Sequence, residues 1–318
     1  MNQTKIAVSV DHGNRHIKTP THVFPASYTE SGHLPSFGGD VLNYMGKEYT
    51  LVDQRMPQKT DKTKDNSYFI LTLLAIGKEL AGVIHDAVPS EHIEIDLLIG
   101  LPPLHCKEMS PRFTDYFKNH ATPLSFVLSK RTYVISIADV YVYPQAYAAV
   151  MTVKERLLAT PMVGLVDIGG YTVDSLQLVG LRPDMSVCTS LYGGVNSLFQ
   201  KINEQVRATG AKNIPDNIIE GILLNDAKVM SGCSQERIDL VRSNAEQFTT
   251  ELLLSVAQSG LDLTENQTVF VGGGSILLRD YIKKSGMVAN PFFVENVCAN
   301  AEGYQLLYNN RNTTRAVP

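Results

Sequence analysis

One stretch of the sequence decides the predicted fold: Val163-Gly164-Leu165-Val166-Asp167-Ile168-Gly169-Gly170-Tyr171-Thr172-Val173-Asp174. Its apolar start predicts a short buried strand, which stops at an acidic residue followed by two glycines. A strand pattern resumes over 171–179, so the segment predicts a β-hairpin with Asp167 beside a glycine tip. Glycines let backbone N–H groups approach a phosphate, because no Cβ is in the way. A Gly-Gly pair is also typical of an ordinary hairpin turn, and this stretch alone leaves both interpretations open.

A second candidate phosphate site follows a strand predicted over 6–10. Asp11 at the strand end can hold a hydrated Mg²⁺, Gly13 and Asn14 can turn the backbone under phosphates, and Lys18 on the returning strand can neutralise phosphate oxygens. A surface hairpin with scattered charges is the alternative. Two side chains of this segment lack a third ligand at metal spacing and are expected to be loop residues: His12 and His16.

Two further segments can contribute to such a site. Gln145 follows Pro144, where the sequence predicts the first turn of a helix. A side-chain amide can both accept from and donate to an attacking water, although a glutamine on a helix surface is the alternative. The run Gly272-Gly273-Gly274-Ser275 lies between a strand predicted over 268–271 and a helix predicted over 276–284. Glycines at that position expose backbone N–H groups at a helix N-terminus, whereas the same composition elsewhere is typical of a flexible linker.

Length and composition limit the class of protein. At 318 residues the chain is long enough for two domains, and its 44% hydrophobic and 19% charged residues are those of an ordinary globular protein. The net charge of −4 gives no general attraction to nucleic acid. Without a signal-peptide pattern or a run near the roughly 18 apolar residues of a membrane span, we expect a cytoplasmic protein. Four cysteines lie too far apart for a metal site and are expected to be reduced thiols: Cys106, Cys188, Cys233 and Cys298.

In the first half of the chain, residues 30–67 are polar and predict a small peripheral subdomain. Its charged run over 59–65 is expected to be a solvated loop. A largely buried helix is predicted over 68–85, and a strand over 93–101 is expected to end at Pro102-Pro103.

In the second half, Thr160-Pro161 interrupts the pattern and marks the predicted domain boundary. A helical insertion follows the central hairpin, with helices predicted over 195–208, 214–224 and 235–258. The end of the chain, 309–318, is predicted to be disordered.

Together these segments resemble the motifs of the actin/sugar-kinase/heat-shock-chaperone ATPase superfamily. The resemblance covers nearly the whole chain and rests on five segments in the superfamily's order: Asp11-x-Gly13 with Lys18 (first phosphate motif), Pro144-Gln145-Ala146 (first connecting helix), 167–172 (second phosphate motif), 271–275 (adenosine motif) and 299–304 (second connecting helix).

Within the superfamily the chain looks most like the bacterial actin-like proteins that segregate plasmids, the ParM group, which the segment Ala299–Tyr304 resembles in particular. The resemblance implies an α/β, actin-like fold of two lobes, each with a central β-sheet flanked by helices, and nucleotide in the cleft between the lobes. The implied boundaries are domain I over 1–160 with a subdomain at about 30–84, domain II over 161–298 with a helical subdomain at about 200–264, and a C-terminal helix returning to domain I and tail over 299–318.

The resemblance also implies roles for single residues. Asp11 and Asp167 would hold Mg²⁺ through water, and Gln145, helped by Asp167, would position the attacking water. Lys18 and the backbone of Gly13 would contact the phosphates. The other implied nucleotide-binding residues are Asn14, Gly169, Gly170, Tyr171 and Thr172 near the phosphates, Gly272, Gly273, Gly274 and Ser275 at the ribose and adenine, and Lys201 and Glu204 over the base.

The implied function is an ATPase that forms actin-like filaments with Mg²⁺ and ATP, GTP also being possible. Such a filament would segregate plasmid DNA through a DNA-binding adaptor protein, with no direct contact to nucleic acid or membrane. Two positions depart from the pattern. Gln145 stands where relatives can carry Glu, and an amide is a poor base, so turnover is expected to be slow. Pro20 closely follows Lys18 and shortens the returning strand.

Two other functions stay open at this point. A small-molecule kinase of the same superfamily would need an acceptor pocket with a catalytic carboxylate, and the sequence has no distinct sugar-binding signature. An actin-like scaffold would bind nucleotide and barely hydrolyse it. A cell-shape protein of the MreB type is not expected, because residues 1–5 are too few and too polar for a membrane-binding helix.

Overall fold

The computed structural model describes residues 4–31, 40–53, 61–84, 92–120 and 122–315. The chain divides into two compact units. Unit 1 consists of residues 1–152 and 296–318, and unit 2 of residues 153–295. The domain limits predicted from the sequence are 160 and 298.

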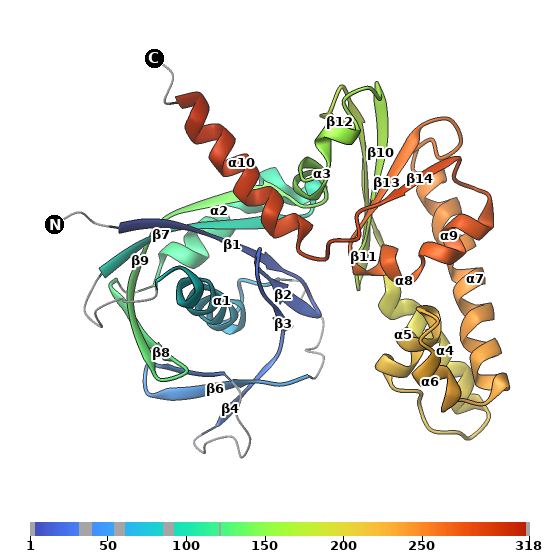
Figure 1. The fold of residues 1–318 in the computed structure, drawn as a ribbon, viewed down its shortest axis with the longest axis horizontal. Coiled ribbons are helices and arrows are strands. Elements are labelled where there is room, and N and C mark those ends of the chain that lie inside the picture. The colour runs from blue at the N-terminus through green and yellow to red at the C-terminus, as the bar shows by residue number, and fades with distance from the viewer. Residues whose placement is uncertain (1–3, 32–39, 54–60, 85–91, 121, 316–318) are drawn as a thin grey trace. The chain divides into compact units, whose positions relative to one another are not determined.

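Unit 1 is built on a sheet that has nine strands within the described residues (Figure 1). Their order across the sheet is β3-β2-β1-β7-β9-β8-β5-β6-β4. The central strands β1, β7 and β9 are parallel, and every residue of β7 from Ile95 to Leu101 is buried, as is typical of a parallel strand that is covered on both faces. The strands are β1 (Thr4–His12), β2 (His16–Lys18), β3 (Val23–Pro25), β4 (Tyr28–Ser31), β5 (Val41–Tyr44), β6 (Lys47–Leu51), β7 (His92–Leu101), β8 (Leu124–Leu128) and β9 (Arg131–Pro144).

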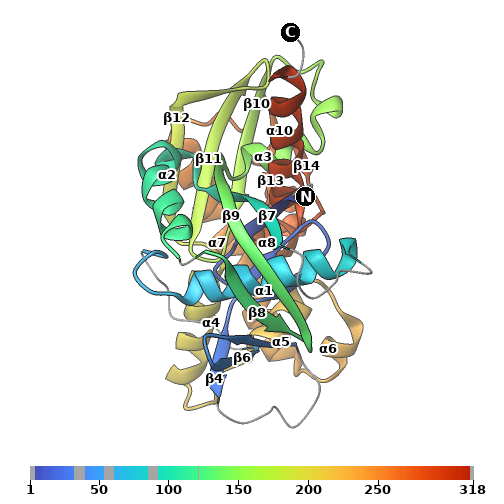
Figure 2. The same cartoon turned by 90° about the vertical axis from the view of Figure 1, so that its left-hand side faces the viewer.

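The helix α1 (Ser67–Val83) lies inside the curve of this sheet, beside β1, β2 and β8 (Figures 1 and 2). Every residue from Tyr68 to Gly77 is buried, because strands surround the helix and leave it no solvated face over that length. The helix predicted over 68–85 is therefore present with slightly shifted ends.

Three other helices belong to unit 1: α2 (Pro103–Lys118), α3 (Tyr147–Met151) and α10 (Ala299–Arg315). The sequence did not indicate α2, because Pro102-Pro103 is equally typical of the end of a strand. Pro103 occupies the first helical turn, where a missing N–H costs nothing. The disorder predicted for 309–318 is wrong for Asn309–Arg315, which continue α10. Tyr308 anchors this end of the helix, since its ring packs edge-on against Tyr141 and its hydroxyl donates to Asp96.

Unit 2 has a five-stranded sheet within the described residues, in the order β12-β11-β10-β13-β14. The predicted central hairpin is present as β10 (Met162–Ile168) and β11 (Thr172–Val179), which pair antiparallel. On the other side, β13 (Gln267–Val271) lies parallel to both β10 and β14 (Asn290–Phe293), and β12 (Arg182–Tyr192) forms the far edge beside β11.

The helices of unit 2 bury one apolar core against this sheet and against one another. The helices α4 (Val195–Ala208) and α7 (Gln235–Gln258) have the limits that their apolar spacing predicts. The single helix predicted over 276–284 is wrong: α8 (Gly273–Leu277) starts earlier, and Leu278 separates it from α9 (Arg279–Ser285). The remaining helices are η1 (Lys154–Arg156), α5 (Asp216–Leu223) and α6 (Ala227–Ser231). Among the residues described, no helix is both long and apolar enough to cross a membrane.

Candidate functional site

Three of the predicted site residues meet at the end of β1 in unit 1. Asp11 is only 2% exposed, and Lys18 lies directly opposite it on β2. The Lys18 Nζ is 3.3 Å from Asp11 Oδ2, and Gln145 Nε2 donates to Asp11 Oδ1 at 3.1 Å. One buried carboxylate thus holds both a lysine ammonium and a side-chain amide in place.

Gly13 forms the tight tip between β1 and β2. Its N–H donates to the Asp11 carbonyl oxygen at 3.0 Å. A Cβ added to Gly13 would lie 2.5 Å from the His16 carbonyl oxygen, so a residue with a side chain cannot take this position without moving the backbone. The neighbouring Asn14 accepts a hydrogen bond from the Tyr68 hydroxyl of α1 at 3.3 Å.

The expectation that His12 and His16 are loop residues is wrong. His16 begins β2, and His12 ends β1 with 2% exposure. The His12 ring stacks on Phe117, and its Nε2 lies 2.7 Å from Thr72 Oγ1. Burial lowers the pKa of His12 to about 3, with the Lys62 ammonium adding to the effect, so the imidazole stays neutral. Its alternation with Val8 and Val10 is the sequence signal that places it on a core face.

The position of Gln145 also differs from the prediction. The chain around Pro144 does not open a helix, because β9 continues through Pro144 and the Gln145 N–H donates to the Leu101 carbonyl oxygen at 2.8 Å. Ala146 then turns the chain with a φ of +59°, and α3 begins at Tyr147.

The C-terminal helix α10 braces this turn within unit 1. Asn300 Oδ1 accepts from the Ala146 N–H at 2.8 Å. Tyr304 is fully buried against the ring of Tyr143 and crosses over Gly100, where an added Cβ would lie 1.8 Å from the tyrosine oxygen and 2.9 Å from Gln145 Cγ. The Asn-Ala-Glu-Gly-Tyr segment therefore helps to fix the glutamine that contacts Asp11.

In unit 2, Asp167 and the glycine run come together where β10 and β13 end. Asp167 is paired with Val271 across the two parallel strands. Gly272 has a φ of +85°, and a Cβ there would lie 2.3 Å from Asp167 Oδ1, so the Asp167 carboxylate occupies space that only glycine leaves open. Gly274 approaches Ile168 as closely, since its Cβ would be 2.6 Å from the Ile168 carbonyl oxygen.

The hairpin tip of unit 2 packs against the start of α4. The carbonyl oxygens of Gly169 and Gly170 accept from the N–H groups of Val195 and Asn196 at 3.1 and 2.9 Å. The Gly169 N–H donates to the Thr172 carbonyl oxygen at 2.9 Å, so this N–H is already used in a hydrogen bond within the hairpin. These hydrogen bonds tie the hairpin tip to the start of α4.

The whole chain is similar in structure to several solved proteins. The archaeal actin homologue Ta0583 matches with a TM-score of 0.75 at 13% identity, over 96% of this chain and 99% of that chain. The chain has an actin-like fold. The same fold relates it to a ParM filament subunit from Clostridium botulinum, with a TM-score of 0.72 at 16% identity over 97% of this chain and 100% of that one. The ADP complex of Ta0583 matches with a TM-score of 0.72 at 15% identity, over 96% and 99% of the two chains.

A sequence comparison supports the actin-like fold in unit 2. Residues 165–284 match the family model described as archaeal actin homologue MreB-like, C-terminal. No curated protein sequence matches the chain.

Several residues predicted to bind nucleotide have other contacts in unit 2. Ser275 is fully buried, and its hydroxyl donates to the Gly272 carbonyl oxygen at 2.7 Å. Thr172 Oγ1 donates to Asp174 at 3.2 Å, and the Tyr171 carbonyl oxygen accepts from Gly193 and Gly194. Farther along α4, Glu204 is exposed, and Lys201 Nζ lies 3.7 Å from Glu251 on α7.

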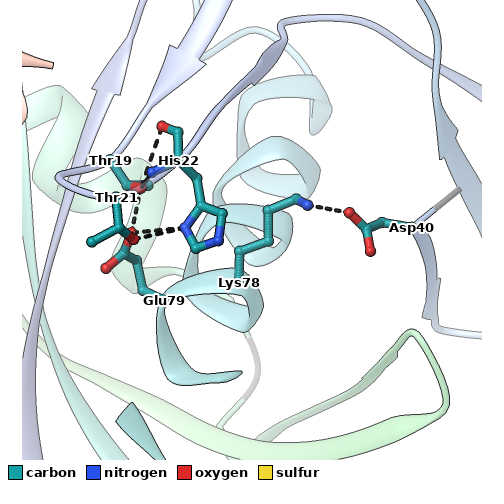
Figure 3. Close-up of polar contacts among 6 residues, drawn as sticks. All are labelled: Thr19, Thr21, His22, Asp40, Lys78 and Glu79. Carbon is teal, nitrogen blue, oxygen red and sulfur yellow. Dashed lines mark hydrogen bonds and ion pairs between the residues drawn. The ribbon is translucent and has the colours of Figure 1, made fainter. Parts of the chain in front are cut away.

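A polar cluster that the sequence did not indicate fixes the chain directly after Lys18 (Figure 3). Thr19, Thr21 and His22 all contact Oε1 of Glu79 on α1, with Thr21 donating at 2.6 Å and His22 Nδ1 at 3.1 Å. Burial by itself would raise the pKa of Glu79, but the hydrogen bonds from these three residues lower it. The short β2 that Pro20 imposes is thus tied to the helix inside the sheet.

The charged run over 59–65 is a solvated loop only in part: Lys64 and Asp65 are exposed, whereas Asp61 and Lys62 before them make contacts with the rest of unit 1. Asp61 pairs with Arg112 of α2 and accepts from the Thr63 N–H at 3.0 Å. The Lys62 ammonium donates to the His12 carbonyl oxygen and lies 5.0 Å from the centre of the Tyr68 ring. Residues 59 and 60 lie outside the described residues.

Proposed function

We propose that this protein is a nucleotide-dependent ATPase that assembles into filaments. The observation that carries the proposal is the cluster of Asp11, Lys18 and Gln145 in unit 1, because it combines a carboxylate, a cation and a water-orienting amide at one glycine tip. The fold adds support, since its solved relatives include ParM and Alp12 filaments and an actin homologue bound to ADP.

The residues present fit a magnesium nucleotide. Oxygen atoms of carboxylates and water are the ligands that Mg²⁺ prefers, and it usually takes only one or two protein carboxylates. That preference suits Asp11 and Asp167, and within the described residues no three His, Cys, Asp or Glu side chains gather into a metal cluster. At Gly272 the missing side chain lets the Asp167 carboxylate lie directly against the backbone of the glycine run. Bound Mg²⁺ would neutralise charge on the phosphates.

In unit 1, each side chain has a distinct task under this proposal. Lys18 neutralises phosphate oxygens, and the tip at Gly13 and Asn14 passes beneath them. Gln145 uses its Nε2 to hold Asp11, so its Oε1 is the atom that accepts a hydrogen bond from the attacking water. Because an amide orients a water without taking its proton, hydrolysis is slow.

In unit 2, the proposal gives Asp167 the second water-mediated contact to Mg²⁺ and a share in orienting the attacking water. The hairpin tip from Gly169 to Thr172 lies against the phosphates, and Gly272, Gly273, Gly274 and Ser275 lie against the ribose and base, where ATP and GTP both remain possible. Lys201 and Glu204 contribute at the base. Ser275 acts there through its backbone, since its hydroxyl is used internally.

At the level of the cell, the proposed filament segregates plasmid DNA in the cytoplasm through an adaptor protein. Loss of the γ-phosphate weakens the contacts between subunits, so the filament is dynamic. A net charge of −4 suits a protein that reaches DNA through a basic partner instead of binding it directly.

The test is light scattering with sedimentation of the purified protein in Mg²⁺ and ATP. We expect assembly above a critical concentration, reversal as phosphate is released, and no assembly of Asp167→Ala. The control variant is Asp239→Ala, which removes an exposed carboxylate of the same unit. A protein that stays monomeric at every concentration and converts ATP to ADP only with an added small-molecule acceptor, to which it transfers the γ-phosphoryl group, would instead be a kinase. Assembly without hydrolysis in a single-turnover assay would indicate a scaffold.

A further inference from the structure

A partly buried ammonium group lies beside the phosphate-binding tip of unit 1. Lys62 Nζ donates to the main-chain oxygen of His12, the residue between Asp11 and Gly13, and it lies over the ring of Tyr68. Within the part of the chain that the structure describes, no acidic side chain forms an ion pair with it. Lys18, by comparison, is paired with Asp11 at 3.3 Å.

The environment of Lys62 favours the arrival of a negative charge. Burial lowers the pKa of Lys62 to about 8, the Asp11 carboxylate acts against this effect, and the Lys18 ammonium adds to it. At neutral pH the group is still mostly charged, and a buried charge is costly unless it is paired. An ammonium carries three donors, and the His12 carbonyl uses one of them. An anion at the tip would supply the missing counter-charge and accept a further hydrogen bond.

The loop that carries Lys62 is held in place on both sides of it. Asp61 is paired with Arg112 on α2, and its Oδ1 also accepts from the Thr63 N–H at 3.0 Å and the Thr63 hydroxyl at 2.7 Å. Two residues beyond Lys62, Lys64 is exposed. The structure therefore distinguishes Lys62 from Lys64 by its lower exposure and by its contact with the tip.

We propose that Lys62 is a second phosphate-binding cation of unit 1, which contacts the terminal phosphate of the nucleotide and so links the 61–65 loop to the phosphorylation state of the ligand. The proposal rests on the proposed nucleotide-binding function and names a residue of the same site. A purely structural role, in which Lys62 only ties its loop to His12, is the competing explanation.

The experiment compares Lys62→Gln, Lys62→Arg and the control Lys64→Gln in full-length protein. Glutamine keeps a hydrogen-bond donor and loses the charge, whereas arginine keeps the charge. Titration with fluorescent ATP and ADP analogues is expected to show that Lys62→Gln weakens ATP binding by about tenfold or more and ADP binding by less. Lys62→Arg should retain most of the affinity, and Lys64→Gln should match the unaltered protein. Circular dichroism and the melting temperature show whether each variant is folded.

Equal affinities of Lys62→Gln and Lys64→Gln for ATP would overturn the inference while leaving the proposed function intact. A second titration, with inorganic tripolyphosphate as the probe, separates the two ideas. Suppose that the unaltered protein binds neither nucleotide, and that tripolyphosphate raises the melting temperature of the unaltered protein and not that of Lys62→Gln. The proposed function would then fail, and the anion site at Lys62 would stand. If tripolyphosphate raises both melting temperatures equally, Lys62 does not bind the anion.

Discussion

The two carboxylate oxygens of Asp11 contact two different side chains, one charged and one neutral. Lys18 supplies positive charge to Oδ2, while Gln145 occupies Oδ1 with a neutral donor. A glutamate in place of Gln145 would bring a second negative charge against the buried carboxylate, which costs free energy. At this position, glutamine therefore serves the stability of the Gly13 tip, and under the proposed function a slower rate of hydrolysis accompanies it.

Gln145→Ala is expected to lower the rate of ATP hydrolysis by about 100-fold, because the water-orienting amide is lost, and to change the affinity for ATP less, because Asp11 keeps its ion pair with Lys18. Phosphate release under single-turnover conditions measures the first effect, and equilibrium titration the second. Gln258→Ala, which changes an exposed glutamine at the end of α7, is the matched control. An unchanged hydrolysis rate in Gln145→Ala would show that another group orients the water.

Single residues also mark the limits of sequence reasoning. The spacing of Asp11, Gly13 and Lys18 was enough to predict that they share one hairpin, and β1 and β2 place Asp11 opposite Lys18. Lys62 could not be found in this way, because a lysine within a charged run has the same appearance in sequence whether it is solvated or buried. Its contact with His12 joins residues fifty positions apart, and only the tertiary fold creates it.

At the scale of elements, the close crossing of α3 and α10 depends on one glycine. A Cβ added to Gly303 would lie 1.9 Å from the Ala148 carbonyl oxygen, so Gly303→Ala must push the two helices apart. We expect it to lower the free energy of unfolding by about 1–3 kcal/mol, measured by urea denaturation. Gly82→Ala is the matched control within α1, since a Cβ there meets nothing within 4 Å. Because alanine favours a helix, this control should gain about 0.5–1 kcal/mol. Equal effects of the two substitutions would contradict the close crossing.

The link between α1 and the turn after β2 is expected to depend on pH. The pKa of Glu79 is lower in the folded protein than its ordinary value of 4.5, so the ionised carboxylate stabilises the fold above that pH. This stabilisation is lost as the pH falls through the folded pKa, where the carboxylate takes up a proton. Glu79→Gln should therefore lower the free energy of unfolding by about 1–2 kcal/mol at pH 7.

The difference between Glu79→Gln and the unaltered protein should shrink as the pH is lowered below 4.5, which urea denaturation at a series of pH values measures. Glu108→Gln, on the exposed side of α2, is the control and should show no such trend. A difference that stays constant from pH 7 down to pH 3 would mean that the charge of Glu79 does not matter to the turn.

Periodic elements were predicted better than their junctions. The limits of α4 and α7 follow from their apolar spacing, because each helix buries one stripe in the core of unit 2. The helix start predicted around Pro144 was wrong, since proline is compatible both with the end of a strand such as β9 and with the first turn of a helix. The Gln145 hydrogen bond to Leu101 decides between them, and it is a contact between distant segments.

At the scale of the whole molecule, the fold was predictable because five short motifs occur in one order, although each is ambiguous alone. The composition of the segment around β5 and β6 suggested a separate peripheral subdomain, yet both strands belong to the same nine-stranded sheet as β1, among the residues described. The order of strands in that sheet joins segments that are far apart in sequence. Local patterns contain no information on such pairings, and the sequence alone could not supply them.

Unit 1 is made of two separate segments of the chain, which has a consequence for folding during synthesis on the ribosome. All of unit 2 is one continuous segment, 153–295, so it has every residue it needs before α10 is synthesised. Unit 1 begins before unit 2 and is completed after it, because the brace of Asn300 and Tyr304 behind Gln145 is synthesised with α10. The glutamine contact with Asp11 is thus braced only after all of unit 2 has been synthesised.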